Sequence, residues 1–195
     1  ALAVLESGVM TPEDTLFCPA SIQADEYTVS DAHERGDETM SLRQILDNSS
    51  NVGISLAVEK MGFDGLVEII NRYHLNEKTG VDYPGESSGY MQDFNTWAKI
   101  TGYNVSFGQG ISCTPLQMTR FYAAVANDGT MVTPHFLISL PQSGERPTYE
   151  TEQVDDNQAA IENLRSMMRT VVTEGTGKDA NIEGYDVVGK TSTAE

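Results

Sequence analysis

Residues 184–195 read GYDVVGKTSTAE and match two motifs that carry different chemistry. The first eight residues fit the pattern G-x-x-x-x-G-K-T, which binds nucleotide phosphates in P-loop proteins. The run from Lys190 to Thr193 instead offers an ammonium group beside three hydroxyl side chains, which suits recognition of a peptide carboxylate. The context of this stretch therefore decides between a nucleotide ligand and a peptide ligand.

The surroundings of this stretch argue against a P-loop. A P-loop follows a buried hydrophobic strand and opens a helix at its Lys, whereas the residues before Gly184 are the polar sequence GKDANIE. Asp186 lies at a loop position where it would repel phosphate, and the valines after it favour a strand. We therefore expect residues 184–193 to form a strand with Val188, Lys190 and Ser192 on one face, whose backbone can pair with an extended peptide.

A second polar group lies in the sequence LDNSSNVG, where Ser49, Ser50 and Asn51 stand between two predicted helices. At such a junction a hydroxyl can relay a proton and an amide can hold a carbonyl group. Serine and asparagine are also favoured cap and turn residues. Taken alone, the group is therefore better explained by a structural role, and it gains meaning only together with the Lys190 segment.

Helices are the main elements that must position these groups. Ser41 and Gln44 form a capping box, as do Thr114 and Gln117, with Pro115 in the first helical turn. Apolar periodicity, caps and glycine stops predict helices within residues 41–48, 51–62, 63–75, 114–129 and 155–175, after a first helix that ends near Gly8. Short extended pieces are expected at TLF and YTV in the loop after Gly8, and over residues 130–140.

Composition narrows the class of partner. Twelve basic and 29 acidic residues give a net charge of −17, which argues against a nucleic-acid partner. The three histidines and the two cysteines, Cys18 and Cys113, lack the spacing of metal ligands, so neither a metal nor a cofactor is expected. The cysteines are free to pair in an oxidising compartment, which the sequence leaves open. With 39% hydrophobic residues and no apolar run long enough to span a membrane, the composition is that of a soluble globular domain.

Taken together and in order, these segments resemble the transpeptidase domain of class B penicillin-binding proteins. SSN matches the family's Ser-x-Asn motif, and GKTSTAE stands at its Lys-Thr-Gly strand. The stretch SFGQGISCTPLQMTRFYAAVANDGTMVTPH is similar to the Gly-Gln-Gly, Thr-Pro-x-Gln and Ala-x-Ala-Asn-x-Gly landmarks. The resemblance implies an α+β fold, with residues 1–195 as one partial domain: the helix-rich part of the β-lactamase/transpeptidase-like fold, with few strands.

The resemblance also implies a reaction, the cross-linking of peptidoglycan stem peptides through a serine acyl-enzyme. In that reaction Ser49 would relay a proton, and Asn51 would hold the catalytic lysine and the substrate amide. Lys190 would supply positive potential, and Thr191 and Thr193 would bind the substrate carboxylate. The implied partners are stem peptides, β-lactam antibiotics, and proteins of cell division or elongation.

Two departures from the family pattern limit these expectations. Residues 1–195 contain no Ser-x-x-Lys motif, and the nearest approaches, at Ser143 and Ser166, end in an Arg that cannot act as a base. The nucleophile is therefore expected upstream of Ala1, which would leave this stretch inactive alone. Ser192 replaces the usual Gly of the Lys-Thr-Gly strand, where its Cβ would crowd a substrate lying along the strand while its hydroxyl could add a contact. We therefore expect an altered β-lactam preference, whose direction the sequence leaves open.

The sequence leaves two alternatives open. One is a β-lactamase or a penicillin-sensing domain, which uses similar motifs but is less consistent with the Gly-Gln-Gly and Thr-Pro-x-Gln landmarks. The other is a non-catalytic relative that serves as a peptidoglycan or cell-division scaffold. For the transpeptidase, the site of the chemistry places the protein at the outer face of the bacterial membrane, held there by an upstream anchor.

Overall fold

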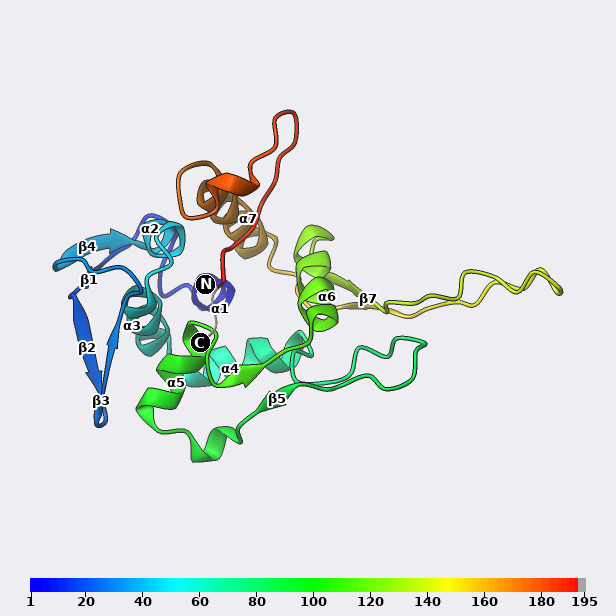
Figure 1. The fold of residues 1–195 in the computed structure, drawn as a ribbon, viewed down its shortest axis with the longest axis horizontal. Coiled ribbons are helices and arrows are strands. Elements are labelled where there is room, and N and C mark those ends of the chain that lie inside the picture. Colours follow the sequence, from blue (N-terminus) through cyan, green and yellow to red (C-terminus); the bar gives the residue numbers. More distant parts are fainter. Residues whose placement is uncertain (193–195) are drawn as a thin grey trace.

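Helices form most of the regular structure in the computed structural model, which describes residues 1–192 (Figure 1). The helices are α1 (Leu2–Glu6), α2 (Leu42–Asp47), α3 (Asn51–Met61), α4 (Phe63–Arg72), α5 (Lys99–Ser106), α6 (Pro115–Ala126) and α7 (Gln158–Thr173). Two short 3-10 turns, η1 (Phe94–Thr96) and η2 (Lys178–Ala180), accompany them. The five helical segments predicted from capping and periodicity are confirmed, whereas α5 was not predicted.

The strands are short and pair locally. Within residues 1–192 they form four two-stranded antiparallel sheets, and each strand is two to four residues long. The pairs are β1 (Thr15–Cys18) with β4 (Glu38–Ser41), β2 (Ser21–Ala24) with β3 (Tyr27–Ser30), β5 (Tyr90–Met91) with β6 (Ile111–Ser112), and β7 (Thr130–Val132) with β8 (Thr151–Gln153). The predicted helix-rich α+β class is confirmed, with the extended pieces at TLF and YTV becoming β1 and β3.

The two predicted capping boxes are present at the starts of α2 and α6. The Ser41 hydroxyl accepts from the backbone N–H of Gln44 at 3.1 Å, and the Gln44 side chain accepts from the Ser41 N–H at 2.9 Å. Thr114 and Gln117 repeat this arrangement before Pro115 at the start of α6. These bonds satisfy N–H groups that a helix start leaves unpaired, which fixes where each helix begins.

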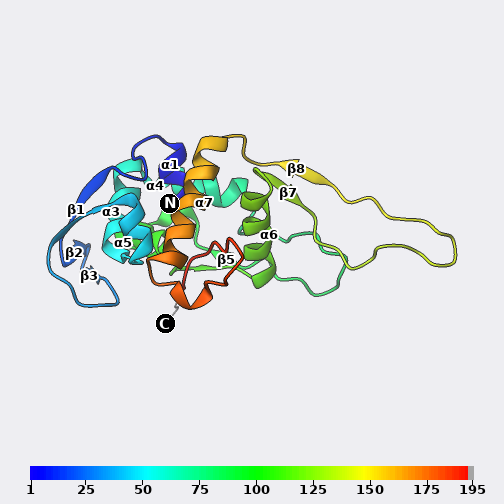
Figure 2. The same cartoon turned by 90° about the horizontal axis from the view of Figure 1, so that it is seen from above.

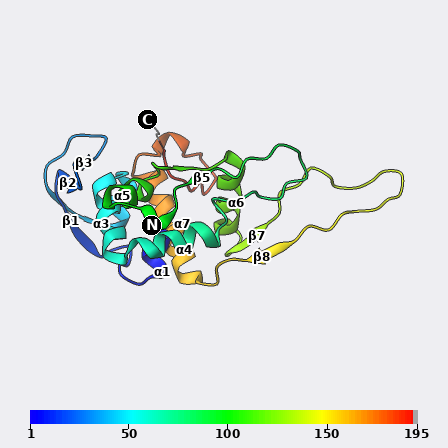
Figure 3. The same cartoon turned by 90° about the horizontal axis from the view of Figure 1, so that it is seen from below.

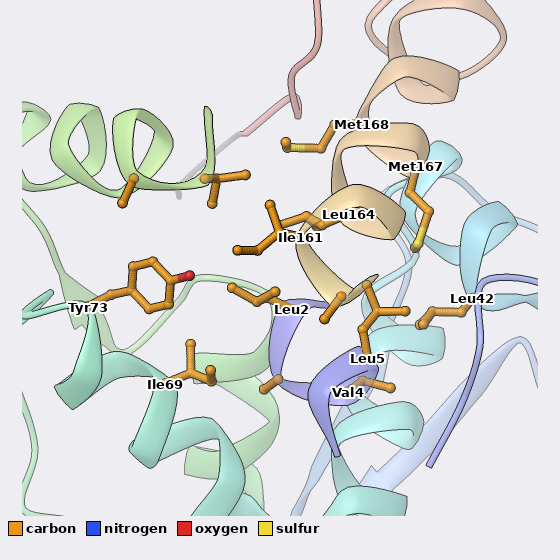
Figure 4. Packing of buried hydrophobic residues seen from close by; sticks show 14 of the residues in the cluster. Leu2, Val4, Leu5, Leu42, Ile69, Tyr73, Ile161, Leu164, Met167 and Met168 are labelled. Atoms are coloured by element: carbon orange, nitrogen blue, oxygen red, sulfur yellow. The ribbon is translucent and has the colours of Figure 1, made fainter. Parts of the chain in front are cut away.

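The main core lies between α7 and helices from the first half of the chain (Figure 4). Ile161, Leu164, Met168 and Val171 recur at three- and four-residue spacing along α7 and are all buried. Ile161, Leu164 and Met168 pack with apolar side chains of α1 and α4, and with Leu42 of α2. Each such side chain contributes about 1.5–3 kcal/mol when fully buried, so this core holds α7 against α2.

A second apolar cluster lies beneath the β-hairpins. Its buried members are Cys18, Ala24, Val29, Met40, Ile45, Val52 and Tyr103. They come from β1 to β4, the α2–α3 pair and α5, and Figure 3 shows these hairpins beside α3 and α5. Cys18 and Cys113 are both free thiols, and only Cys18 belongs to this cluster. The cluster fixes the position of the hairpins relative to the start of α3.

The strand predicted for residues 184–193 is wrong for the part that the structure describes. Residues 185–192 form no strand, and Thr193 lies outside the described residues. A strand needs a hydrogen-bonded neighbour, but here the backbone bonds to the end of α7 instead. The Gly189 N–H donates to the Met168 carbonyl at 3.3 Å, and Arg169 Nη1 donates to the Val187 carbonyl at 2.9 Å. The segment therefore runs along α7 as an irregular strip.

A long excursion between β7 and β8 reaches away from the helices (Figures 1 and 2). It carries Phe136, Ile138 and Leu140, and the first two are more than 70% exposed. Among the described helices, none is both long and apolar enough to cross a membrane.

Candidate active site

The side chains of Lys190 and Ser49 meet although 141 positions separate them in the sequence. Lys190 Nζ donates to Ser49 Oγ at 2.7 Å, and both side chains are partly buried. The structure thus brings together the two polar groups that the sequence singled out. The segment around Lys190 lacks the context of a P-loop, because residues 185–192 contain no helix that starts at Lys190.

Ser49 occupies a constrained turn between α2 and α3. Its φ is +54°, in the left-handed region that costs a non-glycine residue about 1–2 kcal/mol. The turn is held from both sides, because the N–H groups of Ser49 and Ser50 donate to carbonyls of α2, and the Ser50 hydroxyl accepts from Gly53 N–H at 2.9 Å at the start of α3. This unusual backbone conformation sets the direction of the Ser49 Cα–Cβ bond, and such strained residues often occur at functional sites.

Asp31 holds the start of α3 from the other side. Its carboxylate accepts from the Ser50 hydroxyl at 2.8 Å and from the Val52 N–H at 2.9 Å, and it pairs with Arg35 Nε at 2.5 Å. Sequence reasoning missed Asp31, because it lies in a turn-rich loop with no periodic signal. Its only signal was an Asp four residues before an Arg, which is common in solvated loops.

Lys190 has three hydrogen-bond acceptors and no carboxylate partner in the described part of the chain. Besides Ser49, its ammonium donates to the backbone carbonyl of Thr191 at 2.8 Å and to the Thr191 hydroxyl at 3.2 Å. Burial lowers the pKa of Lys190, because the charged form loses hydration there. A positive charge held in this way is available to an anionic ligand.

The other predicted site residues differ in their exposure and in their distance from Lys190. Thr191 is exposed and its hydroxyl is 2.7 Å from that of Thr176. Ser192 is exposed as well, and Thr193 falls outside the described residues. The Asn51 amide donates to the Ser30 carbonyl at 3.1 Å, and no described hydrogen bond joins it to Lys190. Ser49, Lys190 and Thr191 thus form the cluster itself, and Asn51 lies on the adjoining helical turn.

The turn after α7 connects this cluster to the end of α2. Thr176 N–H donates to the Asp47 carbonyl at 3.0 Å, and the Thr170 hydroxyl donates to the Asp47 carboxylate at 2.7 Å. Asp47 is buried, and this burial raises the pKa of its carboxyl group. Because Asp47 is two residues before Ser49, these bonds fix the distance between the Ser49 turn and the segment that carries Lys190.

Gly175 is required by close backbone approach, which gives a testable prediction. A Cβ atom at Gly175 would lie 2.5 Å from the Asp47 carbonyl oxygen, so Gly175→Ala must push the turn away from α2. We expect a loss of about 1–3 kcal/mol in the free energy of unfolding, measured by urea denaturation. Gly36→Ala is the control, because a Cβ there meets nothing within 4 Å. Equal midpoints for the two variants would contradict this packing.

The histidines serve other contacts. His74 lies 3.1 Å from carboxylate oxygens of both Glu77 and Glu152, and His135 stacks on Tyr149 at 3.8 Å between ring centroids. Within residues 1–192, no group of three or more His, Cys, Asp or Glu side chains is arranged to hold a metal ion.

Comparison with known proteins places this geometry in a family context. The family model described as "Penicillin binding protein transpeptidase domain" matches residues 1–195. Penicillin-binding protein PbpB of Mycobacterium tuberculosis is 36% identical over 100% of the chain and 30% of its own length. Stage V sporulation protein D of Bacillus subtilis is 28% identical over 100% of the chain and 31% of its length. The chain therefore spans about a third of the length of these curated relatives.

A solved structure agrees with these sequence matches. Penicillin binding protein 3 from Mycobacterium tuberculosis, crystallised with aztreonam, superposes with a TM-score of 0.86 at 34% identity. The match covers 94% of this chain and 43% of the other. The same protein has also been crystallised with ampicillin, with the same TM-score of 0.86.

Proposed function

This chain belongs to the family of penicillin-binding protein transpeptidase domains, and we propose that it is one part of a serine-type peptidoglycan D,D-transpeptidase. The curated relative PbpC of Pseudomonas aeruginosa, 29% identical over 98% of the chain, is described as a probable peptidoglycan D,D-transpeptidase. The proposed substrates are stem peptides and, as inhibitors, β-lactams. The protein would act outside the cytoplasmic membrane, held by an anchor and assembled with cell-division or elongation proteins.

The contact between Lys190 and Ser49 is the observation that supports this proposal. In an acyl transfer to serine, a proton must reach the leaving amine, and a hydroxyl beside an ammonium group can relay it. Ser49 Oγ receives a hydrogen bond from Lys190 Nζ at 2.7 Å, which orients its lone pairs and favours donation of its own hydrogen to substrate. Ser49 is therefore proposed as the proton relay.

Carboxylate recognition is proposed for Lys190 and its neighbours. Lys190 donates to the Ser49 hydroxyl and to two oxygens of Thr191, and its ammonium would attract the terminal carboxylate of a stem peptide or a penicillin. Thr191 supports this by exposing a hydroxyl next to the ammonium, and Thr193 and Ser192 follow it in the sequence. Asn51 is proposed to turn its amide from Ser30 toward substrate and the catalytic lysine.

The nucleophile is proposed to come from a Ser-x-x-Lys segment, which residues 1–195 do not contain. Residues 1–195 would then supply the relay and the carboxylate site of a single domain that this chain covers in part. The bond broken is the amide between two D-alanine residues, with the last one leaving as a free amine. The acyl group passes first to the serine oxygen and then to an amine of a second stem peptide.

Intact-mass spectrometry of the full-length protein with benzylpenicillin tests the proposed function. We expect one covalent adduct of the mass of one penicillin, lost when the serine of the Ser-x-x-Lys motif is replaced by alanine. Persistence of the adduct for hours would support a transpeptidase, whereas rapid release would indicate a β-lactamase. A folded full-length protein that forms no adduct would contradict the proposal and favour a non-catalytic scaffold.

A further inference from the structure

A closed ring of contacts runs through the proposed carboxylate site and includes one residue with no assigned role. Lys190 contacts Ser49 and the Thr191 hydroxyl, and Thr191 contacts the Thr176 hydroxyl at 2.7 Å. The backbone of Thr176 bonds to the Asp47 carbonyl at 3.0 Å, and Asp47 leads back to Ser49 along the chain. Thr176 thus links two parts of the ring: its side chain contacts Thr191 beside Lys190, and its backbone bonds to Asp47 at the end of α2.

The chemistry of the ring assigns a direction to the hydrogen bonds that Lys190 makes. An ammonium group only donates, so the Thr191 hydroxyl, 3.2 Å from Lys190 Nζ, must accept that bond. The Thr191 and Thr176 hydroxyl oxygens lie 2.7 Å apart, and either of them can be the donor. Without Thr176 Oγ1 the Thr191 hydroxyl would keep only its bond from Lys190, and its orientation toward the ammonium would be less restrained.

The anchor of Thr176 is rigid although its side chain is exposed. Gly175 packs against the Asp47 backbone so closely that a Cβ would lie 2.5 Å from the Asp47 carbonyl oxygen. The Asp47 side chain is in turn buried and bonded to Thr170 of α7. The Thr176 hydroxyl is therefore presented from a fixed backbone, and because it is exposed, removing it should cost little stability.

We infer that Thr176 is a positioning residue that orients the Thr191 hydroxyl and, through it, the Lys190 ammonium toward the carboxylate of the substrate. This inference rests on the proposed function, because it concerns the same carboxylate site. It assigns to Thr176 a role in recognition of the anionic end of the substrate and none in bond breaking.

Three variants of the full-length protein test this role. Thr176→Val removes the hydroxyl at nearly constant shape, and Thr176→Ser retains it. Thr173→Val is the matched control, because the exposed Thr173 hydroxyl at the end of α7 bonds only to the carbonyl of Arg169 in its own helix, at 3.2 Å. Acylation rates are measured by mass spectrometry with benzylpenicillin and with its methyl ester, which lacks the carboxylate charge.

The expected result is a selective loss. Thr176→Val should acylate with benzylpenicillin about five- to tenfold more slowly than wild type, the effect of one lost hydrogen bond, and should react with the ester at the wild-type rate. Thr176→Ser and Thr173→Val should keep both rates within about twofold. An equal loss with both compounds, or no loss, would overturn the positioning role. A wild-type protein that is not acylated would overturn this inference together with the proposed function.

Discussion

Replacing Lys190 with methionine in the full-length protein is expected to lower the rate of acylation by benzylpenicillin about 100-fold at neutral pH. The substitution removes the ammonium that contacts Ser49 and Thr191 but keeps a flexible side chain of similar length. A partly buried positive charge interacts strongly with an incoming carboxylate, because little water screens the pair. The measurement is the second-order rate constant from intact-mass spectra.

The pH dependence of acylation separates charge from shape in this prediction. Burial lowers the pKa of Lys190, so its positive charge is present below that pKa and lost as the pH rises through it. Acylation should therefore fall at a pH below the value of about 10.4 at which a solvated lysine loses its proton. Lys190→Arg should react more slowly at neutral pH but lack this alkaline fall, because a guanidinium stays charged. The same alkaline fall in both proteins would contradict the assignment to Lys190.

The sequence predicted the helices well because each carries its own boundary signals. The capping boxes at Ser41 and Thr114, with Pro115 and the apolar spacing of α7, depend only on neighbours within a few residues. Helix α5 lacks such signals, since no side chain caps its start at Ala98. It is held instead by tertiary contacts, such as Tyr103 in the cluster beneath the hairpins, which local patterns do not reveal.

The conformation of the Lys190 segment, unlike that of the helices, could not be predicted from local signals. Its valines favour a strand, but a strand requires a partner, and here the backbone around Gly189 bonds to α7. The family resemblance assigned Lys190 and Ser49 to one site, but their contact across 141 positions has no local signal and was not predicted. The supporting residues Asp31, Asp47 and Thr176 were missed for the same reason, because each acts through a residue far away in the sequence.

Asp31→Ala is expected to lower the free energy of unfolding by about 3–5 kcal/mol, which would make Asp31 the strongest single support of the Ser49 turn. The Asp31 and Arg35 side chains are only 9% and 14% exposed, and removing the carboxylate leaves the guanidinium buried without a counter-ion. It also leaves the Ser50 hydroxyl and the Val52 N–H, which the carboxylate now binds, without their acceptor. Urea denaturation gives the measurement.

Two further variants distinguish a buried ion pair from general disruption of the loop. Asp14→Ala removes an exposed carboxylate that accepts from the Thr11 N–H at 2.7 Å, so it should cost no more than about 1 kcal/mol. Adding Arg35→Met to Asp31→Ala removes the uncompensated charge and should recover part of the lost stability. If Asp31→Ala unfolds at the same urea concentration as Asp14→Ala, the Ser49 turn does not depend on this pair. In that case its left-handed backbone must be held by its own bonds to α2, by the Ser50 hydroxyl and by the core beneath it.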